Sequence, residues 1–331
     1  MIRKFTFALV AIVMLAAALA FSQVASKPAA APASKGTVAL RTTDGQPDLQ
    51  GVWSTATTVP LERPANLGAK EFYTPEELAA NAARAGQRKG KAAPREDGAL
   101  AVHYDLSQFA LNRREIAPSL RTSLIVGPEG RIPPTTDAAK QRAAAAAAIR
   151  RDHGFDGPEN RGLAERCILW GSEGPPMMAA GYNDNLQIVQ GPGYVAILQE
   201  MIHDTRMIPT DGSAHPDKNV KLWFGDSRGH WEGNTLVVDT ANFNGRAAWR
   251  GSSENLHVTE RFTRKDAETL TYQFTVEDPA TWTQPWSAEV SWVKSANDRI
   301  FEYACQEGNY GMANILSGVR ATEAKQAAGA K

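Results

Sequence analysis

The chain lacks an excess of charge of either sign. Its 331 residues include 36 Lys and Arg against 36 Asp and Glu, so the formal net charge is zero. Nucleic-acid binding depends on Lys and Arg gathered along one surface, and the neutral balance therefore argues against nucleic acid as a partner. Hydrophobic residues make up 43% of the sequence, which is enough to build a core and excludes a chain that is disordered throughout.

Cysteine is scarce. Only Cys167 and Cys305 occur, and neither belongs to a C-x-x-C or zinc-type spacing. In an oxidising compartment the two could form one long-range disulfide. Two buried free thiols that pack as small hydrophobic groups fit the sequence equally well, so both alternatives stay open.

A long apolar segment occurs only at the N-terminus, where a nearly unbroken run over 5–20 follows Arg3 and Lys4. This run of about 16 residues is short for a membrane-spanning helix, which needs ~20. A basic start, an apolar run and a small-residue end are typical of a signal peptide. We predict a signal peptide over 1–20, a flexible leader over 21–40, and a periplasmic or secreted protein with no membrane anchor after cleavage.

Familiar catalytic and nucleotide-binding motifs are missing. The P-loop, G-x-S-x-G and H-E-x-x-H patterns do not occur. Residues 191–196 have the form G-x-G-x-x-A, but a dinucleotide fingerprint needs a helix that begins at the glycines. Because the run that starts at Tyr194 is typical of a strand, we predict a hairpin turn there and no nucleotide cofactor.

Residues 41–185 predict a strand start followed by a helix- and loop-rich extension. The strand covers Leu49–Thr55. Thr74 and Glu77 fit a capping box around a proline at the first helical position, which predicts a helix to about Arg84.

Two further segments of this extension have a clear composition. The alanine-rich residues 138–151 carry the strongest helix formers and predict a second helix. Basic residues over 84–95 stand among Gly, Ala and Pro with no acid between them. This composition indicates a solvated loop rather than an anion-binding patch.

After Leu186 the sequence changes to short β-rich runs separated by turn residues. Residues 269–276 alternate apolar and polar side chains, as a strand with one buried face requires. We predict a mainly β domain over 186–320, an antiparallel meander that closes into a calycin- or lipocalin-like barrel or a curved sheet. The extension over 41–185 packs on it, and 321–331 form a disordered tail. The predicted strands are 186–190, 194–203, 221–224, 235–240, 256–264, 269–276, 288–293 and 299–305.

Two resemblances accompany this pattern. The tripeptide Gly51-Val52-Trp53 has the G-x-W form that opens lipocalin-type barrels, although more than 130 residues separate Trp53 from Leu186. The runs GVW, DSRGHWEGNTLVVDTANF, RGSSENLHVTERFTR and EYACQEGNYGMANILSG make most of the mature chain similar to an uncharacterised family of exported bacterial proteins. This second resemblance implies export and a single shared architecture, and it implies no catalytic residue.

Strand alternation directs Glu260 into the predicted core. A carboxylate there must be paired, or its pKa rises, because burial disfavours the charged form. One hypothesis is a metal-free acid/base pair of His203 and Glu260, with Asp204 as an orienting group. The alternative is an ion pair between Glu260 and an arginine such as Arg250. Which face of strand 194–203 points inward stays open.

A second cluster lies in the loop that begins at Asp226. Loops on a rigid sheet are where binding groups gather, so Asp226, Arg228 and Trp231 are predicted substrate contacts. His230 and Glu232 could join a further histidine in a metal site. A hairpin with ordinary turns is the other alternative, and we predict no metal.

A third cluster follows the last predicted strand. Glu307 and Asn309 are candidate substrate contacts, and Tyr310 is a candidate proton donor. A C-terminal turn whose polar groups satisfy the barrel end is equally compatible. Six of the eight Trp lie at or beyond Trp223, which suits either the binding of a sugar or aromatic ring or the packing of a β-rich core.

Three classes of function fit these features. The leading hypothesis is an exported enzyme without cofactor that acts by acid/base proton transfer, as a lyase, isomerase or hydrolase, on a small polar or ring-containing molecule such as a sugar or phenolic. The second is a non-catalytic, lipocalin-like binding protein in which the same residues orient a ligand. The third is a structural module of the cell envelope, for which a solid barrel without a cavity would be the sign.

Overall fold

The computed structural model describes residues 40–89, 115–247 and 249–329. The predicted signal peptide, nearly all of the leader and the second half of the basic run over 84–95 lie outside the described residues, whereas residues 84–89 continue a helix instead of forming the predicted loop. Within the described part, no helix is long and apolar enough to cross a membrane. The strands are β1 (Gly51–Ser54), β2 (Asn185–Gly191), β3 (Tyr194–Gln199), β4 (Thr205–Pro209), β5 (Asp226–Glu232), β6 (Thr235–Ala241), β7 (His257–Arg264), β8 (Thr269–Glu277) and β9 (Trp286–Lys294). The helices are α2 (Pro75–Lys89), α3 (Asp137–His153) and α4 (Tyr310–Gly329), with short 3₁₀ helices η1 (Ala65–Leu67), η3 (Pro158–Asn160), η4 (Met201–His203) and η5 (Trp249–Gly251).

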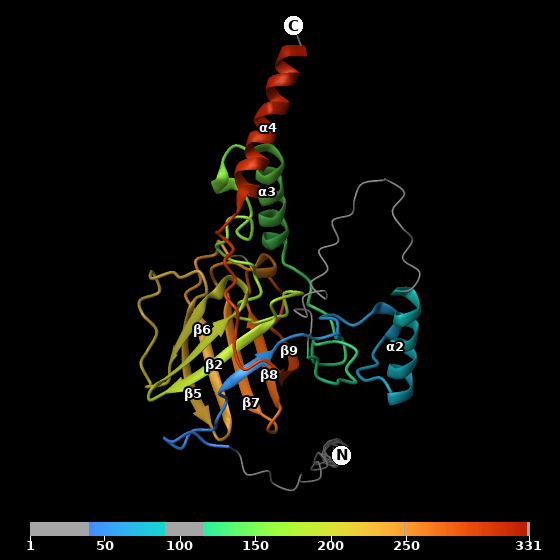
Figure 1. The fold of residues 1–331 in the computed structure, drawn as a ribbon, viewed down its shortest axis with the longest axis vertical. Coiled ribbons are helices and arrows are strands. Elements are labelled where there is room, and N and C mark those ends of the chain that lie inside the picture. Colours follow the sequence, from blue (N-terminus) through green and yellow to red (C-terminus); the bar gives the residue numbers. More distant parts are fainter. Residues whose placement is uncertain (1–39, 90–114, 248, 330–331) are drawn as a thin grey trace, which may run out of the picture. The chain divides into compact units, whose positions relative to one another are not determined.

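The nine described strands form one antiparallel sheet in the order β4-β3-β2-β1-β9-β8-β7-β6-β5. Strands that are consecutive in the chain are neighbours in space, except across one junction, and β1 pairs with β9 to join the two halves. The sheet curves into a nearly closed barrel (Figure 1). The predicted antiparallel meander is therefore confirmed, and its two edges are β4 and β5.

The junction between β4 and β5, called the seam below, is parallel. Each strand runs antiparallel to the neighbours with which it pairs. Because the number of described strands is odd, the two edge strands β4 and β5 run in the same direction. The contacts agree: Arg206 bonds to Ser227, and a Cβ added at Gly229 would lie 3.0 Å from Ile208. No strand pairing joins β4 to β5 in the described sheet, so side chains bridge the seam.

The extension over 55–184 is an insertion between the first two barrel strands. β1 lies between β2 and β9, so one strand of the barrel comes from the predicted extension, and the described residues belong to one compact unit. Trp53 on β1 is fully buried, and Arg264 of β7 stacks on its ring at 5.4 Å. β1 reaches only the end of β9, and residue Ile125 of the insertion bridges to β9 at Ala288.

Alternate residues of the strands fill the barrel interior. Three aromatic side chains of adjacent strands, Phe262, Tyr272 and Trp292, pack against one another with ring centroids 4.5 to 6.0 Å apart. On β3 the inward residues are Val195, Ile197 and Gln199, which settles the orientation that the sequence left open. The core is therefore packed with large rings rather than hollow.

Two predicted strands are absent, and two strands were not predicted: β4, which follows the predicted strand 194–203, and β5, which replaces a predicted loop. Residues 221–224 and 299–305 are bends and turns, whereas 226–232 form β5. In β5 only Ser227, Gly229 and, in part, Trp231 face inward, so an apolar alternation is missing from its sequence. An edge strand with charged outward side chains resists pairing with other chains, and that charge pattern made it look like a loop.

Both predicted helices are present and begin at capping residues. Thr74 and Glu77 exchange hydrogen bonds as a capping box at α2, and Thr136 caps α3. The tail prediction over 321–331 was wrong for 321–329, because α4 extends to Gly329. Its second half is rich in Ala and also holds Glu, Lys and Gln, all strong helix formers.

Cys167 and Cys305 form a disulfide, with Cα atoms 5.6 Å apart. Of the two alternatives that the sequence left open, the bonded one is therefore observed. The bond ties the insertion to the segment between β9 and α4. A cross-link over 138 positions stabilises a fold mainly by restricting the unfolded chain.

The unsealed seam predicts uneven hydrogen exchange. In β4 and β5 about half of the backbone amides point away from the single paired neighbour, so they should exchange fast, whereas β8 is paired on both sides. Exchange followed by mass spectrometry should show partial protection over 205–209 and 226–232 and near-complete protection over 269–277. Equal protection of all three segments would show that the seam is sealed in solution.

Candidate functional site

The buried carboxylate inside the barrel is paired with an arginine. Glu260 on β7 is 0% exposed, and Arg206 on β4 donates to both of its oxygens at 3.1 and 2.6 Å. Arg206 also donates to Ser227 on β5 at 3.0 Å. The alternative of an ion pair between Glu260 and an arginine is therefore observed, with Arg206 as the partner instead of Arg250, the example given from the sequence.

Tyr272 on β8 completes this cluster. Its hydroxyl donates to Glu260 at 2.7 Å and accepts from the backbone N–H of Met177 at 2.9 Å. Burial, and then the nearby charge of Glu260, raise the pKa of Tyr272 well above its ordinary value, so the phenol keeps its proton. Both oxygens of Glu260 are thereby engaged, and its carboxylate acts as a structural bridge between β4, β7 and β8.

The predicted acid/base pair is not assembled. His203 lies in η4 with a positive φ, is exposed, and its Nδ1 is 2.8 Å from the carbonyl of Tyr303. Asp204 accepts from the backbone N–H of Thr205. The strand that was predicted to include His203 ends at Gln199, so its alternation does not extend to His203. Glu260 is enclosed in the barrel, so His203 and Glu260 do not share a site.

Asp226 and Arg228 belong to a polar cluster on the outer face of β5 and β6. Arg228 donates to both oxygens of Asp226 at 2.7 and 2.9 Å. His215 bridges Asp226 and Asp239 at 2.7 and 2.8 Å, and His257 contacts Asp239 at 2.5 Å. These contacts hold residues 210–225, called the strap below, against the outside of the barrel.

The remaining predicted contacts lie elsewhere. Trp231 packs in part against the core, His230 contacts Glu232, and Arg261 donates to Glu232. Among the described residues, no group of three or more His, Cys, Asp or Glu side chains could hold a metal ion.

The third cluster is also dispersed. Tyr310 is 74% exposed at the start of α4, Glu307 is exposed, and Asn309 donates to the carbonyl of Glu165.

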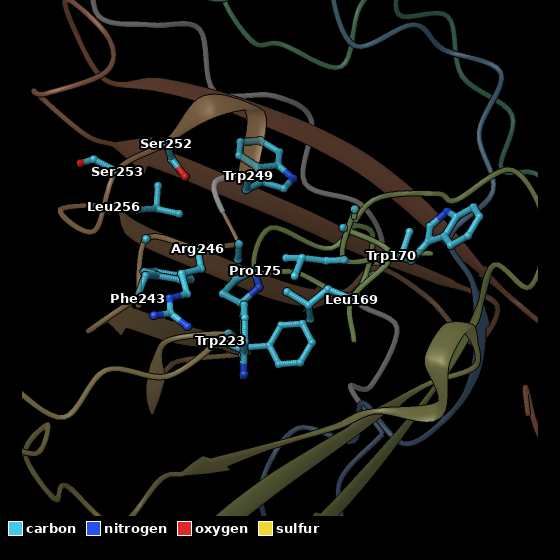
Figure 2. A pocket seen from close by; sticks show the side chains of 18 of the residues that line it. Leu169, Trp170, Pro175, Trp223, Phe243, Arg246, Trp249, Ser252, Ser253 and Leu256 are labelled. Atoms are coloured by element: carbon cyan, nitrogen blue, oxygen red, sulfur yellow. The ribbon is translucent and has the colours of Figure 1, made fainter. Parts of the chain in front are cut away.

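An open pocket of about 390 Å³, called the aromatic pocket below, lies where β5 and β7 begin and β6 ends. Three segments build it: the insertion near Trp170, the strap at Trp223, and the β6–β7 connection at Trp249. Figure 2 shows Leu169, Pro175, Trp249 and Leu256 gathered around the space, with Trp170 at its edge. The wall is therefore mostly apolar and aromatic, as in small-molecule sites.

Packing holds one wall of the aromatic pocket in place. The ring of Trp249 stacks on Trp286 at 5.7 Å and meets Phe274 edge-on. On the opposite side the carboxylate of Glu173, which is 1% exposed, accepts from the backbone N–H groups of Trp170 and Gly171 at 2.9 and 2.7 Å. Burial raises the pKa of Glu173 despite these bonds.

The charged groups of the aromatic pocket are few. Glu165 is paired with Arg161, whereas the guanidinium of Arg246 has no hydrogen bond or ion pair with any described residue. Arg246 is exposed at the pocket wall. An unpaired cation beside apolar rings can orient a ligand that carries an acidic group.

A second cavity of about 340 Å³ opens at the seam and shares Leu169, Trp223 and Phe224 with the aromatic pocket. Arg206 and Ser227 line it. The Nε atom of Arg206 is buried and has no partner among the described residues. The seam cavity therefore leads from the aromatic pocket toward the barrel interior.

Sequence reasoning missed the aromatic pocket. Its rings come from three connections that the alternation of strands does not describe, and Arg246 and Glu173 stand in no motif. The enrichment in Trp was the one signal that pointed to Trp223 and Trp249, but it fitted core packing equally well.

Fold and site together describe a β-barrel with a ligand-sized aromatic pocket at one end. In comparisons with known proteins, no family model, no curated protein and no solved structure matches the chain. The resemblance to exported bacterial proteins and to the lipocalin G-x-W start therefore stays a prediction.

Removal of Arg206 should cost far more stability than removal of an exposed arginine. Arg206→Met leaves the Glu260 carboxylate buried without its partner, which should lower the free energy of unfolding by about 3–5 kcal/mol. Replacing both by methionine should cost less than Arg206→Met alone. Arg261→Met is the matched control, because Arg261 pairs with the exposed Glu232 and should lose at most about 1 kcal/mol. Urea unfolding measures both, and similar losses would contradict the structural role.

The outer cluster predicts a stability that depends on pH. The hydrogen bond to Asp239 raises the pKa of His257 above 6.5, and the same bond lowers the pKa of Asp239 below 3.8. The contribution of His257 to the free energy of unfolding is complete below pH 6.5 and is lost as the pH rises through the folded pKa of His257. The contribution of Asp239 is lost as the pH falls through the folded pKa of Asp239. Three other titratable groups surround this pair. His215 and Asp226 belong to the same cluster, and the charge of Glu277 also raises the pKa of His257.

The melting temperature should therefore fall by about 2 °C between pH 6 and 8 through this pair. His257→Gln should remove that part of the fall, whereas His153→Gln, a change at an exposed histidine on α3, should retain it. The same fall of the melting temperature with pH in His257→Gln and in the unaltered protein would contradict the role given to His257.

Proposed function

We propose that the protein is an exported binding protein that holds a small ring-containing molecule in the aromatic pocket. The observation that carries the proposal is a 390 Å³ space walled by Trp170, Trp223 and Trp249. Aromatic faces bind flat apolar rings, and the volume falls in the range of small-molecule sites. Export rests on the predicted signal peptide.

The unpaired Arg246 narrows the ligand to one with an acidic substituent. A guanidinium beside an apolar wall pairs with a carboxylate and sets its direction. A phenolic acid combines both features, whereas a sugar supplies a ring face but no charge for Arg246. We therefore place phenolic carboxylates ahead of sugars.

The binding hypothesis is favoured over acid/base catalysis because the predicted catalytic groups are occupied elsewhere. Glu260 is bound by Arg206 and Tyr272, and His203 faces the carbonyl of Tyr303. The barrel has a packed interior, so a lipocalin-like function takes the form of a site at the barrel end. A purely structural role would leave the aromatic pocket without a ligand.

Ligand titration tests the proposal. The unaltered protein should show saturable quenching of Trp fluorescence and a raised melting temperature with p-hydroxybenzoate, because a ligand of the native state stabilises it. Trp223→Ala should weaken binding of both p-hydroxybenzoate and phenol by about tenfold. Arg246→Gln should weaken p-hydroxybenzoate by about tenfold and leave phenol unchanged.

Trp231→Phe is the matched control, because Trp231 lies outside the aromatic pocket. It should bind as the unaltered protein does. Absence of saturation with every ring compound, or an equal loss in the control, would overturn the proposal.

A further inference from the structure

A third cavity lies between α3 and the β6–β7 connection and is called the basic groove below. It has a volume of about 540 Å³ and shares Gly245 and Ser252 with the aromatic pocket. The two spaces therefore adjoin across residues 245–252. The basic groove is separate from the ring-binding walls, and its chemistry is different.

One face of α3 forms the floor of the basic groove. Ala139, Ala143 and Ala146 line it at the three- and four-residue spacing that places side chains on one helix face. Small side chains leave the space open. Arg142 and Arg150, about two helical turns apart on α3, also line the groove.

The position of α3 is set by hydrogen bonds to the connection between β8 and β9. The backbone N–H of Thr136 donates to the carbonyl of Thr281, and the Thr136 hydroxyl donates to that of Ala280. Arg142 donates to the same carbonyl of Ala280 and to the hydroxyl of Thr281 at 3.0 and 2.7 Å. The groove is thus held at its end nearest the barrel.

The charges along the basic groove are of one sign. Lys140, Arg142, Arg150 and Arg250 line it, and no carboxylate does. Lys140 is paired with Asp137, but the hydrogen-bond partners of Arg142 are neutral.

The other two arginines have no anionic partner within hydrogen-bonding distance. Arg150 has no hydrogen bond or ion pair with any described residue, and Arg250 stacks on Trp249 at 5.5 Å. Desolvation lowers the pKa of Arg250 although Glu62 acts on it from farther away. Like charges gathered without an anion repel one another, and an anionic ligand would reverse that cost.

We propose that the basic groove binds a small molecule with two or more phosphate or sulfate groups. Arg150 and Arg250 present planar guanidinium forks that match phosphate and sulfate oxygens. Arg142, which donates to Ala280 and Thr281, adds a third positive charge. The volume suits a small molecule rather than a nucleic acid strand, in agreement with the neutral net charge of the chain. This site does not depend on the ligand of the aromatic pocket.

Calorimetric titration with inorganic pyrophosphate tests the proposal. At one fixed ionic strength set with sodium chloride, the full chain should bind pyrophosphate with saturation. Repeat titrations at higher, again fixed, sodium chloride concentrations should give lower affinity. Arg150→Gln/Arg250→Gln should weaken binding by at least tenfold. The single variant Arg150→Gln, at an exposed position on α3, should weaken pyrophosphate binding several-fold. It provides the test even if the double variant does not fold.

Arg151→Gln is the matched control. Arg151 follows Arg150 on α3, and its replacement by Gln removes the same charge. Arg151 pairs with Asp152 and does not line the basic groove. It should bind pyrophosphate within twofold of the unaltered protein. No saturable heat, an equal loss in Arg151→Gln, or tighter binding of an acidic hexapeptide than of pyrophosphate would overturn the proposal.

Discussion

A ring of strands that all run antiparallel to their neighbours closes only when their number is even, and the described barrel has nine. One neighbouring pair must then be parallel, and it is β4 with β5. Parallel neighbours need a long crossover to return the chain to the starting end, which is the strap over 210–225. The strap delivers Trp223 and Phe224 to the end of the barrel, where both line the aromatic pocket and the seam cavity. The odd number of described strands thus requires the strap, and the strap supplies one wall of the aromatic pocket.

The seam also explains why charged side chains lie inside the barrel. Without backbone pairing between β4 and β5, Arg206 joins β4 to Ser227 on β5 and to Glu260 on β7. A buried ion pair is costly to form and costly to break, so it holds the edge strands in one arrangement rather than adding much stability. On the outside, His215 holds the strap to Asp226 and Asp239. The inner cluster around Glu260 and the outer cluster around Asp239 together hold β4, β5 and the strap in place, where the described sheet has no backbone hydrogen bonds between β4 and β5.

The parts of the fold that follow a local rule could be predicted from the sequence. Strand β8 alternates cleanly, and the capping residues Thr74 and Thr136 mark true helix starts. Strand β5 could not be predicted, because at an edge the outward charges replace the apolar alternation. Glu260 was correctly placed inside, but its partner Arg206 is 54 positions away on a strand that was not predicted. Long-range pairing and the aromatic pocket depend on topology, which no local pattern contains.

The packed interior decides where a ligand can bind. Phe262, Tyr272 and Trp292 occupy the space that a hollow barrel would offer, so binding must use the connections at the barrel end. Those connections are fixed by different means: the insertion by the disulfide of Cys167 with Cys305, the strap by the outer cluster, and the β6–β7 connection by the stacking of Trp249 on Trp286. A site whose walls are fixed independently binds without the entropic cost of ordering loops. A solid barrel with three anchored walls therefore favours a preformed pocket over one that closes around its ligand.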